Sequence, residues 1–385
     1  MSQVFPAHWD VLPFSLAVKD ATSEYSKLQK SEYLEQGRFP IVDQGQQKFG
    51  GYTDDESVVS LGGCPAVIFG DHTRIFKFID EPFCLGADGA KVLEPKVELD
   101  KKFLFYYLSS LNIESAGYSR HFKFLKENVV PVPPLPEQKR IATILDKADA
   151  IRRKRQQTIQ LADDFLRAVF LDMFGDPVTN PKGWEVKLLK DLSLKIHSGN
   201  TPKGGKENYV ESGVVFLRSQ NVWKRKIILD DVAYIDAATH RKMAGSSLKH
   251  QDILMTKTGR FNTENSSLGR AAMFFGEDNS ANVNGHVYLI RLGGKVDKKF
   301  VLFILTMPEY YEYIRSVCVG GIDKRQLNKE HLENFPIIFP SADMQRRFSE
   351  ILDVVDSAKV QAANALLSAE MMFDALSQKA FSGQL

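Results

Sequence analysis

The stretch PVPPLPEQKRIATILDKADAIRRKRQQ, residues 131–157, joins two unlike kinds of sequence. It opens with prolines and aliphatic residues, and proline cannot donate a backbone hydrogen bond, so a strand here must end at the edge of a sheet. The apolar residues that follow recur at helical spacing, which predicts a helix over residues 137–173. The stretch PIIFPSADMQRRFSEILDVVDSAKVQA, residues 336–362, repeats the junction, with Ser341 as the expected N-cap of a second helix over residues 341–385.

The two junctions belong to a longer internal repeat, which runs in the same order through both halves of the chain. The matched pairs are Gln138 with Gln345, DKKFLFYYL (100–108) with DKKFVLFIL (297–305), and HWDVLPFSLAVKD (8–20) with GWEVKLLKDLSLK (183–195). The chain is therefore interpreted as two copies of one unit, a globular part followed by a helix. The predicted parts are residues 1–136, 137–173, 174–340 and 341–385.

The globular parts combine short β-like runs with helical segments, which predicts an α+β fold with two mixed α/β domains in tandem. Strands are expected at residues 66–70, 74–79, 214–219, 271–276 and 286–292. One helix is expected in each copy, over residues 101–111 and 298–317.

Each long predicted helix carries apolar residues in the alternating steps of three and four that are typical of a coiled-coil seam. The first seam contains Ile141, Ile144, Ala148, Ile151, Phe165 and Val169, with interruptions at Arg155 and Thr158. The second seam contains Phe348, Ile351, Val355, Ala362 and Leu376. Two modules held apart by such helices could measure the distance between two DNA half-sites.

Composition excludes several classes of protein. No apolar run is long enough for a membrane span, and the N-terminus lacks the pattern of a secretory signal. Three widely spaced cysteines argue against a disulfide framework and a structural zinc site, so we expect a cytoplasmic protein. Residues 174–340 carry an excess of Lys and Arg, whereas residues 1–136 are acidic overall, which favours the later segment for contact with a polyanion.

A search for catalytic motifs finds little. The glycine-rich stretch at residues 199–207 has Gly205 where a phosphate loop requires lysine, and the chain lacks the motif of adenine methyltransferases. Asp80, Glu94 and Lys96 resemble the trio of a metal-dependent nuclease, but Pro95 in the expected strand argues against its geometry. We therefore expect a non-catalytic chain without a metal site.

The order of globular unit, PLPEQKRIATILDKAD, long helix, and the repeat of both resembles the specificity subunit of type I restriction–modification enzymes. The motifs that carry the resemblance are GWEVKLLKDLS…SGNTP (183–202), QDILMTKTGR (251–260), LNKEHLENFPIIFP (327–340) and the Pro-x-x-Glu-Gln helix start at 134–138. The second helix start departs from the pattern, with Ala342-Asp343-Met344 before Gln345.

The resemblance implies that each globular part is a target-recognition domain that reads one half of a bipartite sequence in double-stranded DNA. It implies that the two helices pair as an antiparallel coiled coil, which sets the spacing and docks two modification (methyltransferase) subunits. Restriction subunits with motor and nuclease activity would complete the complex. S-adenosylmethionine, ATP and Mg would then bind to partner subunits, with no cofactor in this chain.

Candidate DNA-binding residues follow from base-edge chemistry, since Arg and Lys suit guanine, Asn and Gln suit adenine, and all suit phosphates. In the first module they are Gln44, Gln46, Gln47, Lys48, Tyr52, Arg120 and Lys123. In the second they are Thr201, Lys203, Arg218, Gln220, Asn221, Lys224, Lys257, Arg260, Asn262, Asn265, Lys324, Arg325 and Gln326. Two alternatives stay open: a stand-alone nuclease that uses Asp80, Glu94 and Lys96, and a coiled-coil scaffold without a DNA role.

Overall fold

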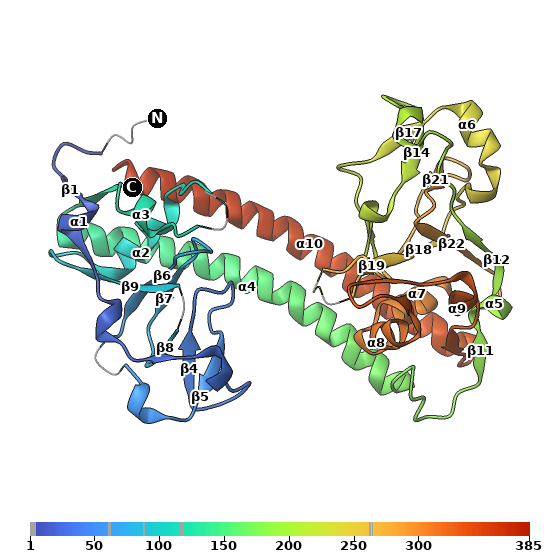
Figure 1. The fold of residues 1–385 in the computed structure, drawn as a ribbon, viewed down its shortest axis with the longest axis horizontal. Helices are drawn as coiled ribbons and strands as arrows, with labels where there is room; N and C mark the ends of the chain where they lie inside the picture. Colours follow the sequence, from blue (N-terminus) through green and yellow to red (C-terminus); the bar gives the residue numbers. More distant parts are fainter. Residues whose placement is uncertain are drawn as a thin grey trace. The chain divides into compact units, whose positions relative to one another are not determined.

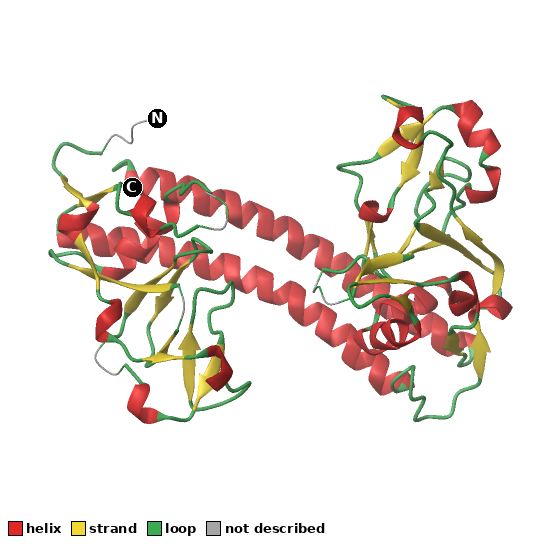
Figure 2. Ribbon diagram, in the orientation of Figure 1, coloured by secondary structure: helices red, strands yellow, loops and turns green. Residues whose placement is uncertain are grey.

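The computed structural model of the chain divides into two compact units (Figures 1 and 2). The structure describes residues 5–60, 63–87, 89–115, 117, 119–261, 263 and 265–385. Unit 1 comprises residues 1–158 and 361–385, and unit 2 comprises residues 159–360. Two helices of 40 residues, α4 (Leu135–Phe174) and α10 (Ala342–Phe381), each contribute to both units. None of the helices within the described ranges combines the length and hydropathy that a membrane span requires.

Unit 1 contains two four-stranded sheets that face each other. The first has the order β2 (Val18–Asp20), β9 (Ala90–Pro95), β6 (Ala66–Gly70), β7 (Phe76–Ile79). The second has the order β3 (Lys27–Leu28), β8 (Cys84–Gly86), β4 (Phe39–Val42), β5 (Gly51–Thr53). The first sheet is antiparallel, whereas β8 pairs in parallel with both β3 and β4.

The core of unit 1 lies on both faces of β6, all of whose residues are buried. Successive side chains of this strand point alternately into two apolar clusters. Val67 and Phe69 pack into the cluster that contains Phe103 of α2 (Lys101–Ser110). Ala66 and Ile68 point to the other face and pack in the cluster shared with the second sheet. A strand covered on both faces reads as a continuous apolar run, and AVIFG at residues 66–70 is therefore predicted with its observed bounds.

Unit 2 repeats this architecture. Its antiparallel sheet has the order β12 (Ser193–Ser198), β22 (Val287–Leu292), β18 (Ile253–Thr256), β20 (Ala271–Met273). Its second sheet has the order β13 (Tyr209–Val210), β17 (Ala233–Ile235), β14 (Val214–Leu217), β21 (Ala281–Val283), and the pair β14–β21 is parallel. Along β18 the side chains alternate in the same way, with Ile253 and Met255 in the helix-side cluster and Leu254 in the cluster between the sheets.

The helix predicted over residues 298–317 is instead two helices, α7 (Lys298–Thr306) and α8 (Pro308–Val317). Pro308 stands at the start of α8, where its missing N–H is tolerated, and Met307 before it adopts an extended backbone. A proline at this point cannot continue the preceding helix, because its ring excludes the helical conformation of the residue before it. The first copy has the single helix that was predicted.

Smaller elements complete both units and follow the sequence repeat. The chain enters unit 1 through β1 (Asp10–Pro13) and α1 (Phe14–Ala17), and the corresponding segments of unit 2 are β11 (Val186–Leu188) and α5 (Leu189–Leu192). The strand before each long helix forms only a two-stranded sheet: β10 (Val129–Val132) with β1, and β25 (Pro336–Ile338) with β11. The remaining α-helices of the described residues are α3 (Phe122–Leu125), α6 (Ala237–Lys242) and α9 (Lys329–Glu333).

The repeated junction of the sequence is a repeated hydrogen-bonded joint. The side chain of Gln138 is fully buried, donates to the carbonyl oxygen of Pro133 at 2.7 Å and accepts from the backbone N–H of Asp100 at 2.7 Å. Gln345 does the same with Pro340 at 2.8 Å and Asp297 at 2.9 Å. Both aspartates cap the N-terminus of the helix that follows them, so each glutamine ties a long helix to the helix of its own module.

The helix starts differ slightly from expectation. Ser341 accepts a hydrogen bond from the backbone N–H of Met344 at 3.4 Å, which is the predicted N-cap contact. The first long helix begins at Leu135, two residues before the predicted position, and therefore includes Pro136 in its first turn. Proline is compatible with that position because the first N–H groups of a helix have no partner within it.

The seam predicted along α4 is correct at its start, wrong at Ile151 and Phe165, and correct again at Val169, which is half-buried against the core of unit 2. Ile141 and Ala148 are buried, but Ile151 is 45% exposed and Phe165 is 53% exposed. Within unit 2 the buried positions of α4 are Leu166, Phe170 and Phe174, which pack against α7. The strict heptad spacing of buried residues does not continue along α4, because the helix packs in the core of a different module in each unit. In α10 Phe348 is buried, and Ile351, Val355, Ala362 and Leu376 are half-buried, as their seam positions predicted.

Contacts between the two long helices can be followed within each unit. In unit 2 the ring of Phe348 lies 5.2 Å from that of Phe170, and Lys359 forms an ion pair with Asp163 at 2.5 Å. In unit 1 the guanidinium of Arg152 lies 4.6 Å above the ring of Phe373. Within unit 2, residue numbers on α10 therefore rise as those of their partners on α4 fall.

Candidate nucleic-acid interface

Both units place a polar loop at the same position in the fold. In unit 1 residues 43–50 follow β4, and in unit 2 residues 218–221 follow β14, and each of these strands pairs in parallel with a neighbour. Ligands bind preferentially beyond the carboxyl ends of parallel strands, where loops from neighbouring strands meet. Residues in both loops were predicted from the sequence to contact DNA. The two stretches share no sequence motif, yet they follow corresponding strands of the two units.

In unit 1 the loop after β4 is tied to the turn between β6 and β7. Gln44 accepts a hydrogen bond from the backbone N–H of His72 at 3.1 Å and, through its own carbonyl oxygen, from Thr73 Oγ1 at 2.6 Å. Gln46 and Gln47 are exposed on the same loop. The anchored Gln44 therefore fixes a loop whose two other amides face solvent.

The second predicted segment of unit 1 reaches the same turn. The backbone N–H of His121 donates to the carbonyl oxygen of Asp71 at 2.8 Å, and the N–H of Phe122 donates to the carboxylate of Asp71 at 2.8 Å. These bonds hold the exposed Arg120 and Lys123 close to the turn that also binds Gln44. Two stretches far apart in the sequence are thus brought together, as the common assignment to DNA contact requires.

Lys48 and Tyr52 lie at the margin of this group. Lys48 forms ion pairs with Asp80 at 3.5 Å and Glu81 at 3.0 Å, and its ammonium lies 5.0 Å from the centre of the Phe49 ring. Tyr52 is half-buried on β5. The charge of Lys48 is balanced by two carboxylates in this structure, so a phosphate would have to displace them.

In unit 2 two predicted segments form one sheet, the three-stranded ribbon β19 (Thr258–Arg260), β24 (Lys324–Gln326), β23 (Val319–Gly320). Arg260 lies opposite Lys324, and Thr258 lies opposite Gln326. Because side chains alternate along a strand, these four residues share one face of the ribbon. Arg260, Lys324 and Gln326 are exposed on that face.

Arg325 belongs to the other face of the ribbon, where a cation–aromatic cluster forms. Its guanidinium lies 4.2 Å from the centre of the Phe261 ring, and that of Arg315 lies 4.4 Å from the same ring. Lys224 lies 5.4 Å from the ring of Tyr311. Aromatic faces attract cations without neutralising them, but Arg315 also forms an ion pair with Glu312 at 3.1 Å, so a carboxylate balances part of the positive charge of this cluster.

Sequence reasoning missed three members of this cluster, Phe261, Tyr311 and Arg315, and two further cation–aromatic pairs, Arg270 with Trp223 and Arg225 with Phe303. Arg270 stacks 3.8 Å from the ring centre of Trp223. The available signal was the spacing of Tyr311 and Arg315, which places an aromatic and a cation one turn apart on a helix. The pairing of Arg270 with Trp223 had no comparable signal, because the two residues meet only through the tertiary fold.

Three predicted contact residues gather around Asp231 in this structure. The amide of Asn221 is 1% exposed and donates to the carbonyl oxygens of Ile228 and Asp231, each at 2.9 Å. Arg218 and Gln220 donate to the Asp231 carboxylate at 2.9 and 3.1 Å, and these bonds lower its pKa. Asn221 therefore shapes the loop from inside and offers no free group to a base in this conformation.

Lys257 is likewise an interior residue. It is 9% exposed, donates to the carbonyl oxygen of Gly285 at 2.6 Å and to Ser198 Oγ, and lies 4.3 Å from the ring centre of Tyr288. No carboxylate is among these partners, and burial lowers the pKa of Lys257 to about 8. The expectation of a surface lysine is corrected, because the ends of β12 and β22 cover it.

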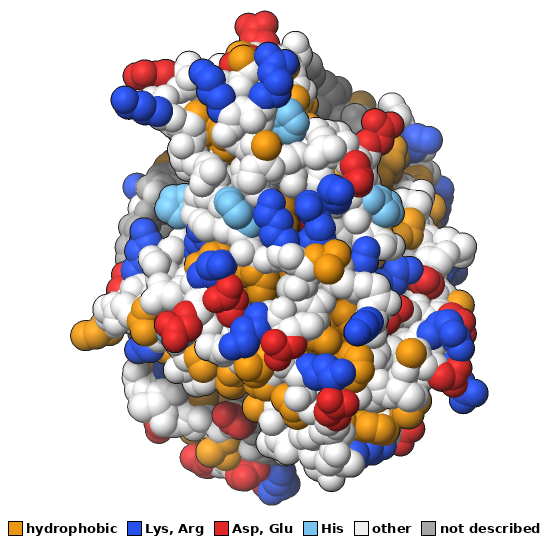
Figure 3. All heavy atoms as spheres, turned by 90° about the vertical axis from the view of Figure 1, so that its right-hand side faces the viewer, with side chains coloured by type: hydrophobic (Ala, Val, Ile, Leu, Met, Phe, Trp, Pro, Cys, Tyr) orange, Lys and Arg blue, Asp and Glu red, His pale blue; other side chains and the backbone are white. Residues whose placement is uncertain are grey.

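Thr201 lies beside this lysine, because both contact Gly285. Thr201 accepts a hydrogen bond from the backbone N–H of Gly285 at 3.3 Å, and Lys203, Lys224 and Asn265 are exposed. Asn262 lies outside the described residues. On the side of unit 2 that carries β12, Lys, Arg and His side chains gather in one band (Figure 3). Burial lowers the pKa of His197, and nearby cations led by Lys195 lower it further.

The nuclease trio is not assembled. Asp80 pairs with Lys48, Glu94 forms an ion pair with Lys101 at 2.8 Å, and Lys96 donates to the carbonyl oxygen of Ser15 at 2.7 Å. Within the described ranges, no three His, Cys, Asp or Glu side chains are grouped so that they could hold a metal ion.

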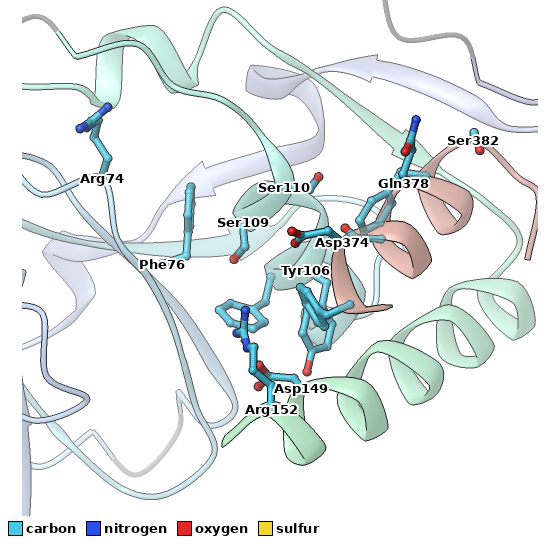
Figure 4. Close-up of a pocket in the computed structure, with 14 residues that line it drawn as sticks. Arg74, Phe76, Tyr106, Ser109, Ser110, Asp149, Arg152, Asp374, Gln378 and Ser382 are labelled. Atoms are coloured by element: carbon cyan, nitrogen blue, oxygen red, sulfur yellow. The ribbon is translucent and has the colours of Figure 1, made fainter. Parts of the chain in front are cut away.

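Unit 1 also contains a cavity of about 770 Å³ between α2, α4 and α10 (Figure 4). Arg152 and Asp149 lie on its α4 side and form an ion pair at 2.5 Å, while Asp374 and Gln378 come from α10. Its described lining contains neither histidine nor cysteine. The lining therefore offers no imidazole or thiol for nucleophilic or general-base chemistry.

Comparison with known proteins supplies an independent result. A family model described as the Type I restriction modification DNA specificity domain matches residues 22–161 and 181–369. The MjaVIII specificity subunit of a type I restriction enzyme from Methanocaldococcus jannaschii is 25% identical, over 91% of this chain and 87% of its own.

Two solved structures share the fold. The S subunit of a type I restriction–modification system from M. genitalium covers 97% of this chain and 96% of its own, with a TM-score of 0.57 and 17% identity. A chain from a study of complex assembly and conformational transition in a type I system covers 99% of this chain and 100% of its own, with a TM-score of 0.52 and 16% identity.

Proposed function

Because the chain belongs to the family of type I restriction–modification DNA specificity proteins, we propose that it selects the DNA target of such a complex, each unit reading one half of a bipartite site. The observation that carries this proposal is the placement of unlike polar loops at equivalent strand ends of two similar modules. One fold that carries different side chains at the same place can read two different short sequences.

The residues at these positions favour different bases. The exposed amides of Gln46 and Gln47 in unit 1 match the paired donor and acceptor of adenine. Arg260 and Lys324 on the ribbon of unit 2 match the two acceptors of guanine, and both can also bind phosphates. We therefore expect the half-site read by unit 2 to be richer in guanine than the half-site read by unit 1.

We further propose that α4 and α10 form an antiparallel coiled coil that spaces the units and docks two modification subunits. Their contacts within unit 2 support the antiparallel direction. Large apolar side chains outside these contacts remain exposed along the helices, including Leu161, Phe165, Val360, Leu367 and Met371. Val360, Leu367 and Met371 recur at helical spacing on one side of α10, which suits a partner helix.

Methyl transfer and cleavage would then occur on partner subunits that bind S-adenosylmethionine, ATP and Mg, while this chain supplies recognition. The separate partners of Asp80, Glu94 and Lys96 disfavour the nuclease alternative. A scaffold without a DNA role predicts an association that ignores salt, whereas phosphate contacts predict affinity that falls steeply as salt rises.

The test is co-expression of the chain with its modification subunits, followed by mapping of methylated adenines. We expect two short half-sites separated by an unspecified spacer, and methylation at one continuous site or no complex formation would refute the proposal. Insertion of one heptad in both helices, after Thr158 and after Val360, should move the units apart by about 10 Å. That distance corresponds to roughly three base pairs of added spacer. Both half-site sequences should stay unchanged, and a changed half-site would contradict the division of roles.

A further inference from the structure

The turn between β23 and β24 presents an isoleucine to solvent. Ile322 is 88% exposed, more than any other large hydrophobic residue in the described part of the chain. Turn positions favour Gly, Asn, Asp and Ser, which satisfy the backbone of a turn without exposing apolar surface. A single exposed apolar side chain is ordinary on a protein surface, so its surroundings decide whether it has a partner.

The surroundings of Ile322 favour a polyanion. Lys324 follows it by two residues, Arg260 lies opposite Lys324, and both are exposed. Gln326 and Thr258 continue the same face of the ribbon away from the turn. An apolar tip with two cations on the adjoining face suits DNA better than an apolar protein surface, which would have to desolvate both charges.

The width of the ribbon decides which groove it fits. The turn belongs to the hairpin β23–β24, whose two strands lie about 4.8 Å apart. The major groove is about 12 Å wide and admits a two-stranded β-ribbon, whereas the minor groove is only about 6 Å wide. The major groove is also where each base pair presents a distinct pattern of donors and acceptors.

The ribbon is packed on its other face. Arg325 projects there between Gly259 and Gly320, and its guanidinium stacks on the ring of Phe261. A Cβ atom at Gly259 would lie 2.3 Å from the backbone nitrogen of Leu268, so only glycine fits. Gly320 has a φ of +136°, a conformation that side chains rarely adopt. A reading element needs such support to hold its side chains in register with the bases.

Asp323 restricts the orientation further. Its carboxylate is exposed beside Ile322, and its backbone carbonyl accepts from the N–H of Phe261 at 2.9 Å. A carboxylate near phosphates is repelled, but it can accept a hydrogen bond from the amino group of cytosine in the major groove. The turn therefore suits base edges better than the sugar–phosphate backbone.

We propose that the ribbon β19–β24–β23 of unit 2 enters the major groove and that Ile322 and Asp323 at its tip contact base edges, with Ile322 against a thymine methyl group. This inference rests on the proposed function of the chain. Arg260 and Lys324 then hold the ribbon at guanines or at the flanking phosphates.

The experiment compares Ile322→Ser with Leu194→Ser in the complex assembled with modification subunits. Leu194 on β12 is 75% exposed, so both substitutions remove apolar surface from solvent-facing positions of the same unit. Methylated sites of the wild-type complex are mapped first, and a duplex that contains the mapped site then serves as the probe. Thermal unfolding checks that both variants remain folded.

We expect Ile322→Ser to weaken binding to the target duplex about tenfold, the effect of removing a buried apolar contact. Binding to a scrambled duplex and the slope of affinity against salt should stay unchanged, and so should every property of Leu194→Ser. Asp323→Asn should relax base preference within the same half-site that Ile322→Ser affects. Unchanged affinity and an unchanged methylated sequence in both tip variants would overturn the inference. A wild-type complex that methylates no bipartite site would overturn the proposed function instead.

Discussion

Substitution of Phe348 by alanine should destabilise unit 2 strongly, whereas the same change at Phe165 should not. Phe348 is fully buried, with its ring 4.8 Å from that of Phe303 and 5.2 Å from that of Phe170. Removal of a buried phenylalanine ring costs about 3–5 kcal/mol, which corresponds to a fall of roughly 10 °C in the melting temperature of a unit of this size. Phe165 is 53% exposed, and its replacement should cost less than about 1 kcal/mol.

The order of the two variants should reverse when binding of a modification subunit is measured, with Phe165→Ala having the larger effect. A phenylalanine exposes on the order of 200 Å² when free, so docking on Phe165 can bury about 100 Å², or roughly 2.5 kcal/mol at most. Phe165→Ala should therefore weaken the binding of a modification subunit by up to about fiftyfold. Thermal unfolding gives the first comparison, and titration of the labelled chain with modification subunit gives the second.

Each measurement can contradict a separate step of the reasoning. Equal destabilisation by the two substitutions would show that Phe165 is buried. The buried face of α4 would then follow the heptad predicted from the sequence, in contradiction to the structure. A Phe165→Ala chain that assembles like wild type would show that modification subunits do not use this side of the helix. A chain with Val354→Ala, also on a long helix and 71% exposed, serves as a control for general effects of lost apolar surface.

Two further predictions concern buried polar groups. Gln138→Leu and Gln345→Leu should each lower the free energy of unfolding by about 2–3 kcal/mol, measured by urea denaturation. Each substitution leaves the backbone N–H of a helix-capping aspartate and a carbonyl oxygen without a partner. A loss below about 0.5 kcal/mol would mean that water replaces the glutamine. Burial lowers the pKa of Lys257 to about 8 from its ordinary 10.5, so the unfolded chain binds more protons between these pH values and this group makes stability rise with pH across that window. Lys257→Met should remove this rise, on the order of 3 kcal/mol, and equal pH profiles of both proteins from pH 7.5 to 10.5 would show that Lys257 is solvated.

The sequence predicted the parts of the fold that depend on local pattern and on the repeat. Residues 66–70 form the expected strand, Ser341 caps its helix, and the two junctions have the same structure. The break before Pro308 was missed because apolar residues continue at helical spacing on both sides of it. The seam of α4 failed at Ile151 and Phe165 because the burial of Phe165 and Phe170 depends on which module packs there.

Candidate contact residues were harder to predict than elements. A loop that reads DNA and a loop whose amides bind its own backbone have the same composition, so Asn221 could not be distinguished from Gln220. Lys257 looks like any lysine in a polar loop until the strands that cover it are known. The pairing of β19 with β24 joins segments more than sixty residues apart, and no local pattern announces it.

The composition of unit 1 has a consequence for how the chain is made. Its core includes Phe381, whose ring lies 5.7 Å from that of Phe103 and 5.3 Å from that of Tyr107. A ribosome synthesises residues 361–385 of unit 1 only after the whole of unit 2, whose residues 159–360 form one continuous segment. Unit 2 can therefore complete its core first, while the earlier-made module waits with an uncovered apolar surface. Nascent unit 1 is consequently the part of the molecule with most need of a chaperone.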